Sequence, residues 1–162
     1  MVAPNTYLPD EAATLALGAA LARCLEPGLV VYLRGDLGAG KTTLVRGVLR
    51  ALGYTGPVRS PTYTLVELYS VSRLDLHHFD FYRFKDPREW IDAGFRESFN
   101  DRSVSLIEWP EKAGGSLPPA DVEIALQASG PGRGASLAHR SLRGQKCLAC
   151  LAERYPLSSP AS

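Results

Sequence analysis

The chain has 162 residues, a formal net charge of +1 and a hydrophobic content of 45%. This length fits one domain with a core of its own, so we expect a single domain over residues 1–155 and a disordered tail over 156–162. The near-neutral charge excludes a global basic field that would draw the protein to nucleic acid or to an anionic membrane, although it does not exclude a local basic patch.

The N-terminal sequence and the cysteines indicate where in the cell the protein is expected. The first residues, "MVAPNTYLPDEAATLALG", lack the basic segment of a signal peptide, and no apolar run has the roughly 18 residues of a membrane span. Three cysteines without a framework spacing indicate a reducing compartment, so we expect a cytoplasmic protein. Cys147 and Cys150 form a lone C-x-x-C pair, which favours two half-buried helix cysteines over a zinc or redox site.

Hydrophobic periodicity and turn signals predict the order of the elements. Residues 10–25 have helical spacing, with Asp10 as the N-cap and Pro27-Gly28 as the stop. A continuous apolar run predicts a buried strand over 29–33, and a helix over 41–52 follows it. Further strands are expected over 62–69, 74–84 and 103–109 and in a hairpin of 121–129 with 135–143, and further helices over 86–99 and 145–155.

The turn between the first strand and its helix carries the strongest motif. Gly35 to Thr42, "GDLGAGKT", matches the P-loop pattern G-x-x-x-x-G-K-S/T. Glycines let backbone N–H groups point at phosphate oxygens, and the helix that follows directs its positive end at the same anion. Lys41 can reach the β- and γ-phosphates, and the Thr42 hydroxyl can ligate Mg²⁺. We therefore expect an α/β fold, a P-loop NTPase-like three-layer sandwich with a mixed, mainly parallel sheet.

A P-loop needs acidic partners on neighbouring strands. Glu108 ends the apolar strand "SVSLIE" and is the first candidate, the alternative being an exposed glutamate at a strand end. Asp80 is the second, because alternation along its strand places Leu76, His78, Asp80 and Tyr82 on one face. An acid there could orient an attacking water or a metal-bound water, whereas the plain alternative is a solvated charge on an outer face. His77 and His78 point to opposite faces, which makes them poor joint metal ligands.

Several stretches together resemble one family. They are "LPDEAATLALG", "GDLGAGKTTLVRG", "VRSPTYTLVELY", "HFDFYR", "DPREW", "LIEWPEKAGGSLP" and the glycine-flanked Arg133. In this order and at these spacings they resemble TsaE, the small bacterial P-loop ATPases of tRNA threonylcarbamoyladenosine biosynthesis. The resemblance extends from about Leu8 to Leu142. "EWIDAG" departs from the more acidic run that is usual in the family, and the cysteine-containing tail matches no family motif.

The resemblance implies a function and partners. The family hydrolyses ATP and works with the TsaB and TsaD proteins, which together support transfer of a threonylcarbamoyl group to the adenosine beside the tRNA anticodon. Hydrolysis is expected to drive or reset that complex. Contact with tRNA is then expected only through the complex, and no contact with a membrane is expected.

The resemblance also implies roles for individual residues. Lys41, Asp80 and Glu108 would be catalytic, and Thr42 and Glu108 would hold Mg²⁺. The "SPTY" segment with Thr62 would be a switch-like loop near the γ-phosphate. The residues expected to bind or border ATP are Glu11, Gly38, Ala39, Gly40, Lys41, Thr42, Thr43, Thr62, Trp109, Lys112 and Arg133.

Other nucleotide-dependent functions have less support in the sequence. A small-molecule P-loop kinase needs an acceptor pocket and usually an arginine-bearing lid, and "GPGRG" with Arg133 is the only candidate lid. A GTPase would usually carry an N-K-x-D motif, which the sequence lacks. A binding module without catalysis would have no need for the additional acids.

Overall fold

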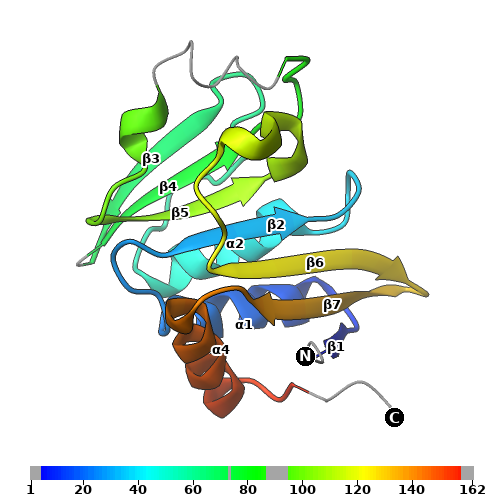
Figure 1. Cartoon of the computed structure of the whole chain (residues 1–162). Helices are drawn as coiled ribbons and strands as arrows, with labels where there is room; N and C mark the ends of the chain where they lie inside the picture. Colours follow the sequence, from blue (N-terminus) through cyan, green and yellow to red (C-terminus); the bar gives the residue numbers. More distant parts are fainter. Residues whose placement is uncertain (1–4, 73, 87–94, 158–162) are drawn as a thin grey trace.

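The protein is an α/β fold built on one mixed sheet (Figure 1). The computed structural model describes residues 5–72, 74–86 and 95–157. The sheet has seven strands in the order β1-β7-β6-β2-β5-β4-β3. The strands are β1 (Asn5–Leu8), β2 (Val30–Arg34), β3 (Val66–Val71), β4 (Leu74–Asp80), β5 (Ser103–Glu108), β6 (Val122–Ser129) and β7 (Gly132–His139). The helices are α1 (Glu11–Ala22), α2 (Lys41–Ala51) and α4 (Leu142–Arg154), with 3₁₀ segments η1 (Phe95–Ser98) and η2 (Pro110–Ser116).

The expected mixed sheet is confirmed, although only three of its six strand pairs are parallel. The four central strands β6, β2, β5 and β4 are parallel, whereas β1 with β7, β7 with β6, and β4 with β3 are antiparallel. The two hairpins explain the difference, because strands joined by tight turns pair antiparallel. The β1 strand, which sequence patterning did not predict, adds the third antiparallel pair at one edge of the sheet. The carboxyl ends of the parallel strands β2, β5 and β4 nevertheless lie side by side at one end of the sheet.

The helices α1 and α2 pack tightly against each other. The predicted cap is confirmed, because the Asp10 side chain accepts a hydrogen bond from the Ala13 N–H. Two glycines let the helix backbones approach. A Cβ at Gly18 would lie 2.4 Å from the Leu44 carbonyl oxygen, and a Cβ at Gly47 would lie 2.4 Å from that of Leu15. Larger side chains at these positions would separate the helices.

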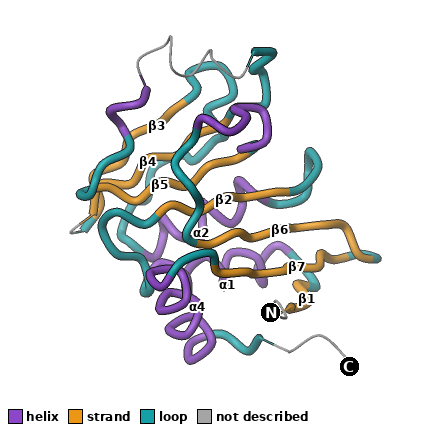
Figure 2. The backbone as a smooth tube through the Cα atoms, viewed as in Figure 1, coloured by secondary structure: helices purple, strands orange, loops and turns teal. Residues whose placement is uncertain are grey.

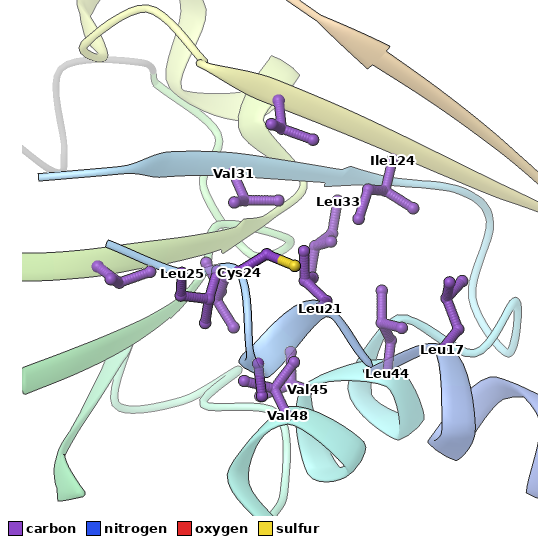
Figure 3. Close-up of a cluster of buried hydrophobic side chains, with 14 of the residues drawn as sticks. Leu17, Leu21, Cys24, Leu25, Val31, Leu33, Leu44, Val45, Val48 and Ile124 are labelled. Atoms are coloured by element: carbon purple, nitrogen blue, oxygen red, sulfur yellow. The ribbon is translucent and has the colours of Figure 1, made fainter. Parts of the chain in front are cut away.

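Alternation along the strands divides the core into two clusters. Val31 and Leu33 on β2 face α1 and α2, where they meet Leu21, Leu44 and Val45 (Figure 3). The opposite face of the sheet holds an aromatic cluster, whose buried members are Phe79, Phe81, Phe84, Ile107, Ala113 and Leu117. In the described part of the chain, 3₁₀ segments and loops cover this second face, so an α-helical third layer is not observed there.

Most of the other predicted elements are present with shifted ends. The strand expected over 62–69 begins only at Val66, and the helix expected over 145–155 begins earlier, at Leu142, after the Ser141 cap. Of the helix expected over 86–99, residues 87–94 lie outside the described part, and Phe95–Ser98 forms a 3₁₀ turn. The proposed tail likewise falls mostly outside it. Within the described residues, no helix is both long and apolar enough to cross a bilayer.

The expectation for the cysteines needs correction. Cys147 is a buried free thiol on α4, as a helix cysteine should be. Cys150, however, is bonded to Cys24, which lies 126 residues earlier in the chain, just beyond α1. The C-x-x-C spacing pointed to the wrong pair, because two cysteines three residues apart on one helix carry no information about a third cysteine that lies after a different helix.

Candidate functional site

The predicted site lies where the parallel strands end. Glu108 is the last residue of β5 and pairs in register with Leu33 on β2 and with Asp80 on β4. The loop after β2 and the η2 segment after β5 leave the sheet at this edge (Figure 2). The loop after β2 and Trp109, which directly precedes η2, border a cavity of about 580 Å³, a volume suited to a small-molecule ligand. In open parallel sheets, ligands bind at such carboxyl ends.

The loop of residues 35–40 bends tightly around one wall of the cavity. Gly35, Gly38 and Gly40 have φ values of 142°, 78° and 104°, which are strained for other residues. The helix α2 begins directly after Gly40 without a side-chain cap. Its first N–H groups are therefore available to an anion at the positive end of the helix dipole.

Lys41 lies buried at the base of this loop. Its Nζ donates to the carbonyl oxygens of Gly35 and Asp36, and it lies 3.9 Å from the ring centroid of Trp109. Burial lowers the Lys41 pKa, and the nearby carboxylates of Glu108 and Asp80 oppose that shift. The ammonium group is thus held in the loop by carbonyl oxygens and by the face of an aromatic ring.

The carboxylate of Glu108 is linked to α2 and to β4. The Thr42 hydroxyl donates to Glu108 Oε2 at 3.0 Å, and the His78 ring nitrogen Nε2 lies 2.6 Å from the same oxygen. His78 is fully buried, and its Nδ1 has no hydrogen-bond partner in the described part of the chain. The ring therefore makes its one hydrogen bond to Glu108 and fixes the position of that carboxylate.

Asp80 is held by the loop that precedes β3. The hydroxyls of Ser60 and Thr62 donate to Asp80 Oδ2, the latter at 3.2 Å, and the Tyr82 N–H donates to Oδ1 at 2.8 Å. Ser60 also lies 3.4 Å from Glu108 Oε2. The Ser60 hydroxyl thereby ties the "SPTY" segment to both carboxylates.

Arg133 lies on β7 and contacts the glycine-rich loop from outside. Its Nε and a terminal nitrogen donate to the carbonyl oxygens of Ala39 and Gly38 at 2.5 and 2.8 Å. Glu11, at the start of α1, lines a smaller neighbouring cavity of about 120 Å³ together with Arg133 and Thr43. Glu11 is also within 3.7 Å of the Arg46 guanidinium.

The structure brings together most of the residues selected from the sequence. The main cavity is lined by the predicted residues Gly38, Ala39, Gly40, Lys41, Thr42, Thr43, Thr62, Asp80, Glu108, Trp109 and Arg133. Two predicted residues are exceptions, of which Lys112 lies exposed on η2 and lines no part of the cavity. Glu11 lines only the smaller neighbouring cavity. The expected bordering role of Lys112 is therefore not observed.

Sequence reasoning gave no role to three residues of the site. Tyr82 and Arg83 line the cavity, and His78 lies behind it against Glu108. Ser60, which belongs to the predicted "SPTY" segment, lines the cavity as well. The signal for His78 was available, since it shares a strand face with Asp80 two residues away. The role of Ser60 depends on how the loop folds back onto β4, which no local pattern encodes.

The donor set fits a hard divalent cation. Two carboxylates, each about 3% exposed, and the Thr42 hydroxyl offer oxygen ligands at one end of the glycine-rich loop. The described residues contain no group of three or more His, Cys, Asp or Glu side chains placed to hold a metal. Mg²⁺ matches this arrangement, because it usually takes one or two protein oxygens and completes its shell with water and phosphate.

Comparison with known proteins agrees with the geometry. Residues 8–135 match the family model described as "Threonylcarbamoyl adenosine biosynthesis protein TsaE". Two relatives named "tRNA threonylcarbamoyladenosine biosynthesis protein TsaE" are from Haemophilus influenzae, 49% identical over 74% of this chain and 79% of the relative, and from Bacillus subtilis, 40% identical over 78% and 77%. The crystal structure of Bacillus subtilis YdiB superposes with a TM-score of 0.81 at 29% identity, over 94% of this chain and 97% of that one. The chain belongs to the TsaE family.

Proposed function

We propose that the protein is a Mg²⁺-dependent ATPase that serves the threonylcarbamoylation of tRNA adenosine. The observation that carries the proposal is the contact of Thr42 with Glu108 at the open end of the glycine-rich loop. A hydroxyl at the start of a helix and a buried carboxylate at the end of the neighbouring strand are the pair that a P-loop ATPase needs around Mg²⁺. A glycine turn without nucleotide function would need neither.

The phosphate chain of ATP would lie along the loop of residues 35–40. The uncapped N–H groups at the start of α2 would bind its β- and γ-phosphates, and Lys41 would transfer its hydrogen bonds from the Gly35 and Asp36 carbonyls to phosphate. Arg133 holds the loop by its carbonyl oxygens and so leaves the N–H groups free to face the ligand. Glu11 and Thr43 border the adjoining small cavity.

Hydrolysis would use the two carboxylates differently. Thr42 and Glu108 would hold Mg²⁺, which when bound neutralises charge on the phosphates. Asp80 would orient the attacking water and accept its proton, since Ser60, Thr62 and the Tyr82 N–H hold this carboxylate at the cavity wall. The "SPTY" segment, fixed to Asp80 by two hydroxyls, is then the element that responds to the state of the γ-phosphate.

The family supplies the biological setting of the proposal. Relatives at up to 49% identity are named for tRNA threonylcarbamoyladenosine biosynthesis. We propose that this chain acts in the same pathway with TsaB and TsaD, and that its ATP hydrolysis drives or resets their complex. Contact with tRNA is then indirect, and the proposed location is the cytoplasm.

The alternative of a small-molecule kinase finds no specific support. Its only candidate lid was "GPGRG", which forms the tight turn between β6 and β7 and the first residues of β7. Arg133 is the second residue of that strand and donates to the glycine-rich loop. Arg133 is therefore positioned to support the loop, whereas the lid of a kinase would have to move freely over the acceptor substrate.

Calorimetry with ATP and Mg²⁺ tests the nucleotide site. Lys41→Ala should weaken ATP binding by at least about tenfold, because a buried charge-assisted contact to phosphate contributes roughly 1.5–3 kcal/mol. Lys112→Ala is the matched control, since this lysine is close in sequence to Trp109 but does not line the cavity. Equal ATP affinity in Lys41→Ala and the unchanged protein would contradict the site.

A further inference from the structure

All three cysteines of the chain meet at a second cavity, away from the proposed nucleotide site. This cavity measures about 240 Å³ and is bordered by Cys24, Cys147, Cys150 and Leu29. Leu29 directly precedes β2, whereas the glycine-rich loop follows β2, so the two cavities lie at opposite ends of that strand. Neither the family motifs nor the proposed ATPase function accounts for this cluster.

Only two of the three cysteines are placed to react with each other. Cys24 and Cys150 are bonded, with their Cα atoms 5.7 Å apart. Cys24 is buried, whereas Cys150 is partly exposed and offers the accessible sulfur of the bond. Burial raises the pKa of the Cys147 thiol to about 12, so this residue stays protonated and does not compete for the disulfide at neutral pH.

The charge of the cavity favours exchange with anionic thiols. Arg23, Arg143 and Lys146 line it, and they outnumber the lining carboxylate of Glu26 and the carboxylate of Asp121, which also acts on Cys147. Positive charge beside a cysteine stabilises its thiolate, which is both the attacking and the leaving form in disulfide exchange. The same charges attract a small thiol that carries carboxylates.

We propose that Cys24 and Cys150 are a redox-active pair that exchanges with a low-molecular-weight, carboxylate-bearing thiol. In reduction, the thiolate of the small thiol attacks Cys150 Sγ, the bond to Cys24 breaks, and Cys24 leaves as a thiolate that takes up a proton. A second small-thiol molecule then displaces Cys150 and carries away the small disulfide. Oxidation is the reverse, so one small disulfide is reduced to two thiols for each bond formed in the protein.

The bond joins the C-terminal helix to the body of the protein. α4 packs on β7 and α1, and it lies beyond residues 8–135, which match the family model. Cys24 immediately follows α1, so oxidation fixes α4 to the helix that packs on α2. Because disulfides in cytosolic proteins of mesophiles are mostly transient or redox-sensing, the expected location also favours a reversible bond.

Redox titration of the full chain tests the proposal. The protein is equilibrated in buffers of stepped reduced and oxidised glutathione, quenched with acid, unfolded, alkylated and weighed by mass spectrometry. We expect three alkylated cysteines at the reducing end and one at the oxidising end, with a midpoint inside the range. The oxidised form should also melt several degrees higher than the reduced form, because the bond closes a long loop. Three free thiols at every ratio would overturn the proposal, as would a bond that native protein never releases.

Single substitutions assign the chemistry to particular residues. Cys24→Ala should trap a mixed disulfide of glutathione on Cys150, whereas Cys150→Ser should leave the buried Cys24 mostly unmodified. Cys147→Ser should titrate as the unchanged protein does, and loss of the transition in that variant would contradict the assignment.

Lys146→Gln should slow exchange several-fold relative to Arg154→Gln, which removes one charge from the same helix outside the cavity. Equal rates would contradict the role of the positive charge.

Discussion

Among the residues that the sequence did not predict for the site, His78 has the clearest effect on the site. It is buried on β4, and its Nε2 contacts the Glu108 oxygen that also accepts from Thr42. Removal of a side chain that orients a metal ligand from behind typically lowers metal affinity about 10- to 100-fold. His78 is therefore a positioning residue in the proposed Mg²⁺ site.

His78→Leu removes this support, while His78→Gln keeps an N–H donor near the position of Nε2. In the leucine variant we expect the Mg²⁺ concentration for half-maximal nucleotide binding to rise about 10- to 100-fold, and in the glutamine variant much less. Calorimetric titration with Mg²⁺ at fixed ATP measures both. An unchanged Mg²⁺ requirement in His78→Leu would show that Glu108 keeps its position without the imidazole.

The reactivity of the Cys147 thiol should depend on pH, which gives a second test at the scale of single residues. Burial raises its pKa from 9.0 to about 12, which reduces the thiolate fraction near neutral pH about a thousandfold. Since the folded state holds this proton more tightly than the unfolded state, the associated stability is complete below pH 9 and is lost as the pH rises towards 12.

Alkylation of the native, oxidised protein at pH 8 should accordingly modify Cys147 far more slowly than the same protein in denaturant. The rate in the folded state should increase steadily up to about pH 12. Labelling at the same rate in both states would mean that Cys147 is exposed, and the inference that it stays outside the exchange reaction would fail.

At the scale of elements, the close pairing of α1 and α2 supports the site. Lys41, Thr42 and Thr43 begin α2, so any displacement of this helix moves the start of the proposed phosphate site. The contact depends on Gly18 and Gly47, each of which faces a backbone carbonyl of the other helix. These oxygens belong to the helix backbone and cannot move aside as a flexible side chain would.

Gly47→Ala should therefore destabilise the protein by about 1–3 kcal/mol, the range typical of overpacking. Gly115→Ala is the control, because a Cβ there would meet no atom within 4 Å. Urea unfolding followed by fluorescence gives the free energies of unfolding of both variants. Equal stability of the two would imply that α1 and α2 separate at little cost.

The elements also show how far the sequence determines the structure. The loop of residues 35–40, the caps at Asp10 and the strand ending in Glu108 have local signals, and the structure has them where those signals predict. The position of Ser60 against Asp80 and the bond between Cys24 and Cys150 depend on contacts distant in sequence. Propensity and periodicity carry no information about such contacts, and β1 was missed because a strand of four residues is too short to show a clear alternation.

At the scale of the whole molecule, two structural centres lie at opposite ends of β2. The carboxyl end holds the proposed ATPase site, where two buried carboxylates, a lysine and an uncapped helix converge. The amino end holds the cysteine cavity, where the bond between Cys24 and Cys150 joins α4 to the body of the protein. The first centre lies at the ends of the parallel strands in the middle of the sheet. Its assignment therefore follows more directly from the sequence than the assignment of the second centre does.

Release of phosphate from ATP, measured with Mg²⁺ in the presence and absence of TsaB and TsaD, tests the central claim most directly. The proposal predicts slow Mg²⁺-dependent hydrolysis by the chain alone and faster hydrolysis with its partners. It also predicts that Glu108→Gln lowers the rate about 100-fold or more while ATP binding persists. Absence of hydrolysis with the partners present, or full activity of Glu108→Gln at normal Mg²⁺, would contradict the claim.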